Sequence, residues 1–130
     1  MLDRTPIENT IYRYAVGFDE NDIAMMANCF TADGEIVTPM GNLSGREAIR
    51  EVFQGRRDLR TQAKEQTRHV VSNVTIEEVS NDEVRASSYY TLMVTGAGTT
   101  TAAGTGRYIA DLVRDGATWL IQRRQLLPDG

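Results

Sequence analysis

Two residue types that often carry chemistry are nearly absent from this sequence. The 130 residues contain one cysteine, Cys29, and one histidine, His69. A lone cysteine excludes an internal disulfide and a thiolate metal cluster. A zinc site would need carboxylates for most of its ligands, which is uncommon. We therefore expect neither a metal nor another cofactor, and a reducing cytoplasm fits this cysteine usage best.

Long apolar runs and basic stripes are also missing. No run approaches the length that crosses a bilayer, and the start, "MLDRTPIENTIYRY", has early acidic residues in place of the apolar core of a secretion signal. The net charge is −4. The one basic run, "GRRDLR", is typical of a solvated face. We expect neither a membrane nor a nucleic acid as partner.

What is present describes an ordinary globular domain. Hydrophobic residues make up 41% and charged residues 25% of a chain long enough to bury a core. There are no internal repeats and no linker, so we expect a single domain over residues 1–130.

The first half of the chain has helical periodicity. Residues 5–18 predict a helix, with Thr5 as cap, Pro6 at the first position and Glu8 completing a capping box. Residues 19–30 repeat the pattern after a polar turn, and residues 31–40 predict a turn and a short strand. Residues 44–55 predict another helix, capped by Ser44 with Glu47 and closed by Gly55.

The second half has strand character from His69 onward. β-Branched and aromatic residues dominate four segments, and the turns "SND" and "RDG" suit antiparallel hairpins. The stretch "TGAGTTTAAGTG" lacks the lysine and the helix of a phosphate loop, so we interpret it as a mobile hairpin connection with strand ends. Helices followed by an antiparallel sheet predict an α+β fold in which a curved sheet wraps three helices around a cavity.

This order of elements resembles the nuclear-transport-factor-2-like superfamily, and within it the SnoaL-like branch. The resemblance rests on "YRYAVGFDENDIAMMANCFTADGEI", "GREAIREVF", "RHVVSNVTIEEV" and "GRYIADLVRDGATWLIQRR", which cover nearly the whole chain. It implies a cone-shaped α+β barrel and a homodimer or homotrimer formed through the outer sheet surface. The superfamily hosts dehydratases, isomerases, cyclases, hydrolases, oxygenase small subunits and non-enzymatic binders, so the fold alone does not select an activity.

Comparison with individual members narrows the choice. The steroid isomerases have a tyrosine on the first helix, which Tyr14 matches, and a carboxylate base where this sequence has Thr38. A threonine cannot replace that base near neutral pH. The dehydratases and dehydrochlorinases have an aspartate after the first helix and a histidine opening the strand after the third, and Asp19 and His69 match both places. The chain departs from scytalone dehydratase in having Phe18 beside the aspartate and no second histidine, and from the dehydrochlorinases in having Tyr14 at their basic position.

An Asp19–His69 pair would act as a general base. An imidazole titrates near neutral pH, and a carboxylate on its far nitrogen fixes its tautomer and stabilises the imidazolium. Tyr14, Tyr89 or Tyr108 could polarise a substrate oxygen. Asn73, four residues after His69, should share its side of the strand and orient a carbonyl.

Each role has a simpler alternative. Asp19 could merely cap the second helix. His69 could face water, because its side of the strand is mixed, with Val71, Asn73 and Thr75 opposite an apolar side of Val70, Val74 and Ile76. The tyrosines could be structural, and Arg107, Arg123 and Arg124 receive no assignment.

The sequence therefore leaves several functions open. The first is a cofactor-independent lyase or isomerase acting on a hydrophobic, carbonyl-bearing small molecule. The second is a non-catalytic binding module, which predicts an exposed His69 with no carboxylate in reach. The third is an oxygenase accessory subunit. An epoxide hydrolase would need an Asp–Arg–Asp set, for which Asp111 with Arg85 or Arg107 is conceivable.

Overall fold

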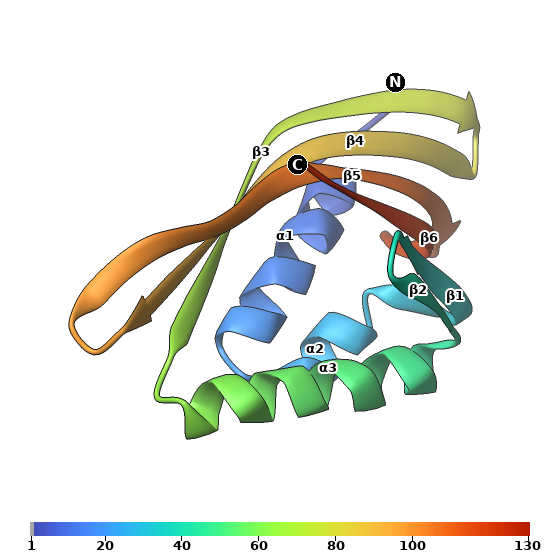
Figure 1. Ribbon diagram of the computed structural model, residues 1–130. Coiled ribbons are helices and arrows are strands. Elements are labelled where there is room, and N and C mark those ends of the chain that lie inside the picture. Colours follow the sequence, from blue (N-terminus) through green and yellow to red (C-terminus); the bar gives the residue numbers. More distant parts are fainter. Residues whose placement is uncertain (1) are drawn as a thin grey trace.

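A curved six-stranded sheet and three helices make up the computed structural model, which describes residues 2–130 (Figure 1). The strand order is β2-β1-β6-β5-β4-β3, antiparallel throughout except for the parallel pair of β1 and β6. In chain order the elements are α1 (Thr5–Asp19), α2 (Ile23–Ala27), β1 (Phe30–Thr38), β2 (Gly41–Ser44), α3 (Arg46–Gln62), β3 (Gln66–Ser80), β4 (Glu83–Gly96), β5 (Thr99–Asp115) and β6 (Thr118–Pro128).

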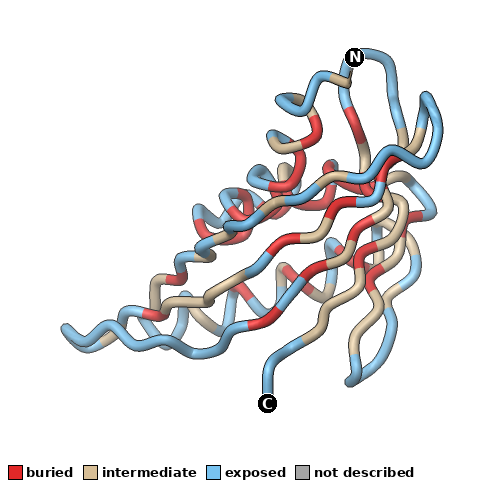
Figure 2. Tube along the Cα trace, turned by 90° about the horizontal axis from the view of Figure 1, so that it is seen from above, coloured by how far each residue is buried: buried red, intermediate tan, exposed pale blue. Residues whose placement is uncertain are grey.

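All three helices lie on the concave side of the sheet, where α1 crosses beneath the strands and α3 closes the far side (Figure 1). Buried residues gather on the surfaces that face each other, while the projecting end of the β4–β5 hairpin is largely exposed (Figure 2). This confirms the predicted α+β architecture, with helices packed on a curved, mostly antiparallel sheet. No helix within residues 2–130 is long and apolar enough to cross a membrane.

The core lies between α1 and the middle strands. The apolar stripe predicted on the first helix is buried as expected, including Ile7, Ile11 and Phe18. On the sheet side, Trp119 and Leu112 are fully covered. Burying such side chains stabilises the fold by roughly 1.5–3 kcal/mol each, so the core holds α1 against the sheet.

The helix ends differ in part from the sequence expectations. Thr5 begins α1 instead of capping it, and Glu8 bonds Arg4 through its side chain, so no capping box forms. At α3 the cap is Gly45 with φ of 94°, and Ser44 makes no capping bond. Gly55 lies inside α3, which continues to Gln62, because its favourable packing and length outweigh one glycine.

The stretch "TGAGTTTAAGTG" is a hairpin, as expected, but most of it is strand, with one register shift opposite Leu92 and Met93. β4 runs to Gly96 and β5 starts at Thr99, so the connection is only Ala97 and Gly98, with φ of 52° and 78°. Positive φ at both central residues is the geometry that matches the twist of two antiparallel strands. The strands were not apparent from the small, threonine-rich composition, because backbone hydrogen bonds pair them and no apolar alternation marks them.

The strand register shifts at several bulges, and two of these matter for the cavity. In β3 the register with β4 shifts between Ser72 and Thr75, around Asn73 with φ of 54°. In β6 the register with β5 shifts by one residue at Gln122. An inserted residue moves every later side chain to the opposite face of the sheet. His69 and Val71 therefore face the helices together with Val74 and Ile76, and the predicted division of β3 into two sides is wrong beyond Ser72.

Gly106 in β5 tests how tightly the inner face is packed. A Cβ there would lie 2.6 Å from the Leu127 carbonyl oxygen and 2.6 Å from the Tyr90 ring, whereas one at Gly104 would meet nothing within 4 Å. We expect Gly106→Ala to lower the free energy of unfolding by about 1–3 kcal/mol, because neither backbone nor ring can move freely. Gly104→Ala is the matched control and should change it by less than about 0.5 kcal/mol. Urea unfolding of both variants measures this, and equal stability would show that β5 yields at Gly106.

Candidate active site

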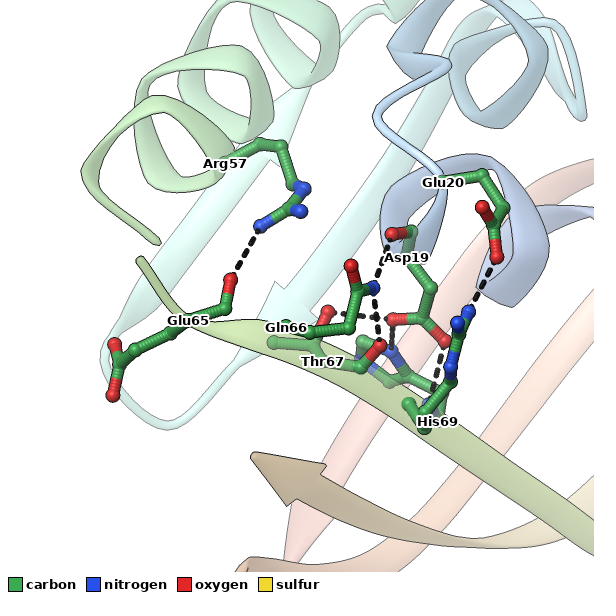
Figure 3. Close-up of polar contacts among 8 residues, drawn as sticks. Asp19, Glu20, Arg57, Glu65, Gln66, Thr67 and His69 are labelled. Carbon is green, nitrogen blue, oxygen red and sulfur yellow. Dashed lines mark hydrogen bonds and ion pairs between the residues drawn. The ribbon is translucent and has the colours of Figure 1, made fainter. Parts of the chain in front are cut away.

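Asp19 and His69 meet where the end of α1 touches the start of β3 (Figure 3). His69 Nδ1 lies 2.7 Å from Asp19 Oδ1. The side chains are 12% and 6% exposed, so the contact is shielded from bulk water. Asp19 does not cap α2, because Asp22 accepts the capping bond from the Met25 backbone N–H at 3.1 Å. The ring edge of His69 also packs against Phe18, with centroids 5.4 Å apart.

The first residues of β3 supply further donors to this end of α1. The Thr67 hydroxyl donates to Asp19 Oδ1 at 2.7 Å, and the His69 backbone N–H donates to Oδ2 at 2.6 Å. The side-chain amide of Gln66 donates to the Asp19 carbonyl oxygen at 2.7 Å, which satisfies one of the free carbonyls at the helix end. Both carboxylate oxygens are thus hydrogen-bonded, as a buried charge requires.

These contacts decide the charge of Asp19. Burial raises the pKa of its carboxyl, but the hydrogen bonds from the His69 ring and backbone, the positive charge that His69 can carry and the Thr67 hydroxyl together outweigh burial, so the pKa lies below its ordinary value. Asp19 is therefore ionised at neutral pH and can only accept hydrogen bonds.

An accepting carboxylate fixes the histidine tautomer. The proton of neutral His69 sits on Nδ1, facing Asp19, so Nε2 carries the lone pair. Within residues 2–130 no other group bonds to Nε2. The ring lines a mostly apolar cavity, so the basic nitrogen belongs to that cavity.

The cavity has a volume of about 640 Å³ and is lined by residues of α1, α3, the β1–β2 turn and five of the strands. This volume falls in the range of pockets that hold small organic molecules. Most of its wall is apolar or aromatic, and its charged residues are three arginines and one glutamate. The lining residues are Tyr14, Phe18, Ile36, Thr38, Met40, Phe53, Arg56, Leu59, Arg60, Glu65, Thr67, His69, Tyr90, Leu92, Tyr108, Arg124 and Leu126.

A stack of three tyrosines and one arginine forms one side of this cavity. The guanidinium carbon of Arg124 lies 3.5 Å from the ring centroid of Tyr14 and 3.6 Å from that of Tyr108. The Tyr90 ring stacks on the Tyr108 ring, with the two centroids 4.6 Å apart. All four of these residues line the cavity, so the stack orients their hydroxyl and guanidinium groups beside it.

The phenols of the stack stay protonated at neutral pH. Burial raises the pKa of Tyr14 to about 12, although the charge of Arg124 opposes the shift. Burial also raises the pKa of Tyr108, again against the nearby Arg124. Both hydroxyls can therefore donate a hydrogen bond to a substrate oxygen.

The structure brings together four of the six residues proposed from sequence: Asp19, His69, Tyr14 and Tyr108. The other two lie elsewhere. Asn73 is exposed at the β3 bulge, which turns its side chain away from the His69 side of the strand. Tyr89 is 53% exposed on the outer face, because in β4 its neighbour Tyr90 takes the inward position. The prediction that Asn73 and Tyr89 line the cavity is therefore wrong.

The other sequence-level suggestions can be placed as well. Arg85 and Asp111 form an ion pair of 2.8 Å, but neither lines the cavity, so an epoxide-hydrolase arrangement does not form there. Thr38 does line it, with its hydroxyl donating to the Gly41 carbonyl oxygen at 2.6 Å. No three His, Cys, Asp or Glu side chains of residues 2–130 are grouped as metal ligands.

Sequence reasoning missed Arg124, Tyr90 and Thr67. Strand alternation from Trp119 and Ile121 would turn Arg123 inward, and only the bulge at Gln122 turns Arg124 inward instead. Tyr89 and Tyr90 are adjacent and point to opposite faces of the sheet, and the sequence does not show which of them points inward. Thr67 lies two residues before His69, so the same-face spacing could have identified it.

The comparisons with known proteins agree with this fold. Residues 1–125 match the family described as SnoaL-like domain. The chain belongs to the SnoaL-like domain family. None of the curated protein sequences matches it.

Solved structures with the same fold include several proteins of similar length. Aln2 from a Streptomyces species shares 27% identity over 96% of this chain and 89% of its own, with a TM-score of 0.82. Rv3472 from Mycobacterium tuberculosis, of unknown function, shares 25% over 96% and 70%, with a TM-score of 0.85. A Novosphingobium aromaticivorans protein, provisionally described as a scytalone dehydratase, shares 24% over 97% and 83%, with a TM-score of 0.82.

The depressed pKa of Asp19 predicts how stability depends on pH. Its contribution to the free energy of unfolding is fully present above the ordinary value of 3.8 and is lost as the pH falls through the lower folded-state value. Asp19→Asn should therefore cost about 1–3 kcal/mol near neutral pH, and the cost should shrink steadily in acid. Urea unfolding of both proteins over a series of pH values measures the difference. The exposed Asp58 gives the matched control, because Asp58→Asn should change stability by less than about 0.5 kcal/mol at neutral pH.

Proposed function

We propose that this protein is a cofactor-independent lyase or isomerase whose general base is the Asp19–His69 pair, acting on a hydrophobic, carbonyl-bearing small molecule. The observation that carries the proposal is the shielded 2.7 Å contact of Asp19 Oδ1 with His69 Nδ1, which leaves Nε2 free beside an apolar cavity. The structure provisionally described as a scytalone dehydratase lends support through its fold.

The chemistry begins with proton abstraction. Nε2 takes the acidic hydrogen from the carbon next to the substrate carbonyl, and the electron pair moves onto the carbonyl oxygen as an enolate. Asp19 stabilises the imidazolium that forms, because its carboxylate stays ionised against Nδ1–H. Such acid–base assistance contributes roughly 10²- to 10⁴-fold in rate.

The second step decides between the two reactions. In a dehydration the enolate expels a hydroxyl from the next carbon, and the imidazolium returns its proton to that leaving group, so that water and a double bond result. In an isomerisation the same proton is returned to a different carbon. Tyr14 or Tyr108, both protonated, can donate a hydrogen bond to the developing enolate oxygen.

The alternative of a binding module without catalysis predicted a solvated histidine with no carboxylate nearby. The observed pair, 12% and 6% exposed and in direct contact, has the opposite properties. A strongly bonded buried carboxylate behind a cavity histidine also matches the perturbed titration typical of catalytic sites. These features support the enzymatic proposal over binding alone.

Substitution of the pair tests the proposal. A panel of β-hydroxy ketones and esters is screened for formation of the conjugated product by ultraviolet absorbance, and unsaturated ketones are screened for double-bond migration. With any compound that turns over, His69→Ala and Asp19→Asn should each lower kcat/KM by about 10²- to 10⁴-fold, because the base or its orientation is lost. Tyr89→Phe, on the outer face, is the control and should keep the full rate. Full activity in both site variants would refute the mechanism.

A further inference from the structure

Arg124 is a buried cation without a carboxylate partner. Its side chain lies on β6 with the residue only 4% exposed, and no ion pair joins it to an acid of residues 2–130. Its neighbour Arg123 has the opposite setting, since it is half-exposed and pairs with Glu35 at 3.2 Å. Buried arginines are normally paired, because moving the charge out of water is costly.

Two tyrosine faces supply part of the missing stabilisation. The guanidinium lies 3.5 Å and 3.6 Å from the centroids of Tyr14 and Tyr108, well within the range of cation–π attraction. The two rings are inclined at 66° to each other, so the guanidinium lies between two aromatic faces that are not parallel. Its N–H groups, which also interact with the Tyr108 hydroxyl, are the part of the side chain available for further hydrogen bonds, and the residue lines the cavity.

The charges around the cavity favour an anion. Of the charged residues that line it, Arg60 bonds Glu65 at 3.2 Å, so that pair is neutral. Arg56 is exposed, lies over the Phe53 ring at 4.7 Å and forms no ion pair with a carboxylate within residues 2–130. The uncompensated charge of the cavity wall is therefore positive.

We propose that the N–H edge of Arg124 is an oxyanion subsite, so that the substrate carries a delocalised anionic oxygen group, a carboxylate or an acidic enol or phenol, besides its apolar body. The planar fork fits such a group with two parallel hydrogen bonds, which a point charge could not provide. The inference rests on the proposed function only in taking this cavity as the substrate site.

Binding of matched probes tests the subsite without any turnover. Benzoate and benzamide have nearly the same shape and differ in charge, and their dissociation constants are measured by calorimetry. Wild-type protein should bind benzoate at least about tenfold more tightly than benzamide, since hydrogen bonds to a charged group are the strong ones. In a second arm, 4-nitrophenol is titrated by visible absorbance, and binding should raise its phenolate fraction at a given pH.

The arginine doublet offers matched variants. Arg124→Gln should abolish the preference for the anion, whereas Arg123→Gln, which changes the outer arginine, should keep it. Arg124→Lys serves if Arg124→Gln does not fold, and should reduce the preference because an ammonium lacks the flat fork. His69→Ala should keep the preference, so loss of turnover and loss of anion binding are separable.

The outcomes are distinct. Preference for benzoate assigns a carboxylate, and stabilised nitrophenolate assigns an enol or phenol; either supports the subsite. Equal binding of benzoate and benzamide together with an unshifted nitrophenol overturns it, as does an anion preference that survives Arg124→Gln. In those cases Arg124 serves only to pack the tyrosines.

Discussion

The carboxylate of Asp19 is the constraint on which the site depends. It is buried and ionised, so its oxygens must be met by donors, and the first residues of β3 supply them from the Thr67 hydroxyl, the His69 backbone and the His69 ring. An unpaired buried charge would cost several kcal/mol, which ties the end of α1 to β3 more firmly than apolar contact alone.

The same contacts stabilise the fold and orient the histidine. The backbone N–H of His69 binds one carboxylate oxygen of Asp19, and the ring of the same residue is oriented by the other. The histidine is therefore held by its main chain and its side chain together. Because Gln66 also bonds the last carbonyl of α1, the helix cannot rotate without breaking the pair. A general base needs this kind of fixed orientation, since proton transfer is sensitive to small displacements.

Sequence alone predicted what periodicity and residue type can carry. The apolar stripe on α1, the antiparallel hairpins, the helices on one face of a curved sheet and the meeting of Asp19 with His69 were all expected. Which face of the sheet a side chain takes after a bulge was not predicted, because an inserted residue leaves no clear mark in the composition. Asn73 was placed in the cavity and Arg124 was left unassigned for the same reason: each follows the opposite face from the one that uninterrupted alternation gives.

The β6 bulge also determines how the charges of Arg124 and Asp19 are arranged. By turning Arg124 inward, the β6 bulge places a buried cation in the same cavity as the Asp19–His69 pair, yet Arg124 forms no ion pair with a carboxylate of residues 2–130. Both carboxylate oxygens of Asp19 accept hydrogen bonds from residues of β3, and the Arg124 guanidinium packs against the rings of Tyr14 and Tyr108. Had the two charges paired directly, each would neutralise the other and neither would remain for a ligand. The aromatic rings lie against the cation, and the neutral His69 imidazole and the Arg124 guanidinium line the same apolar cavity.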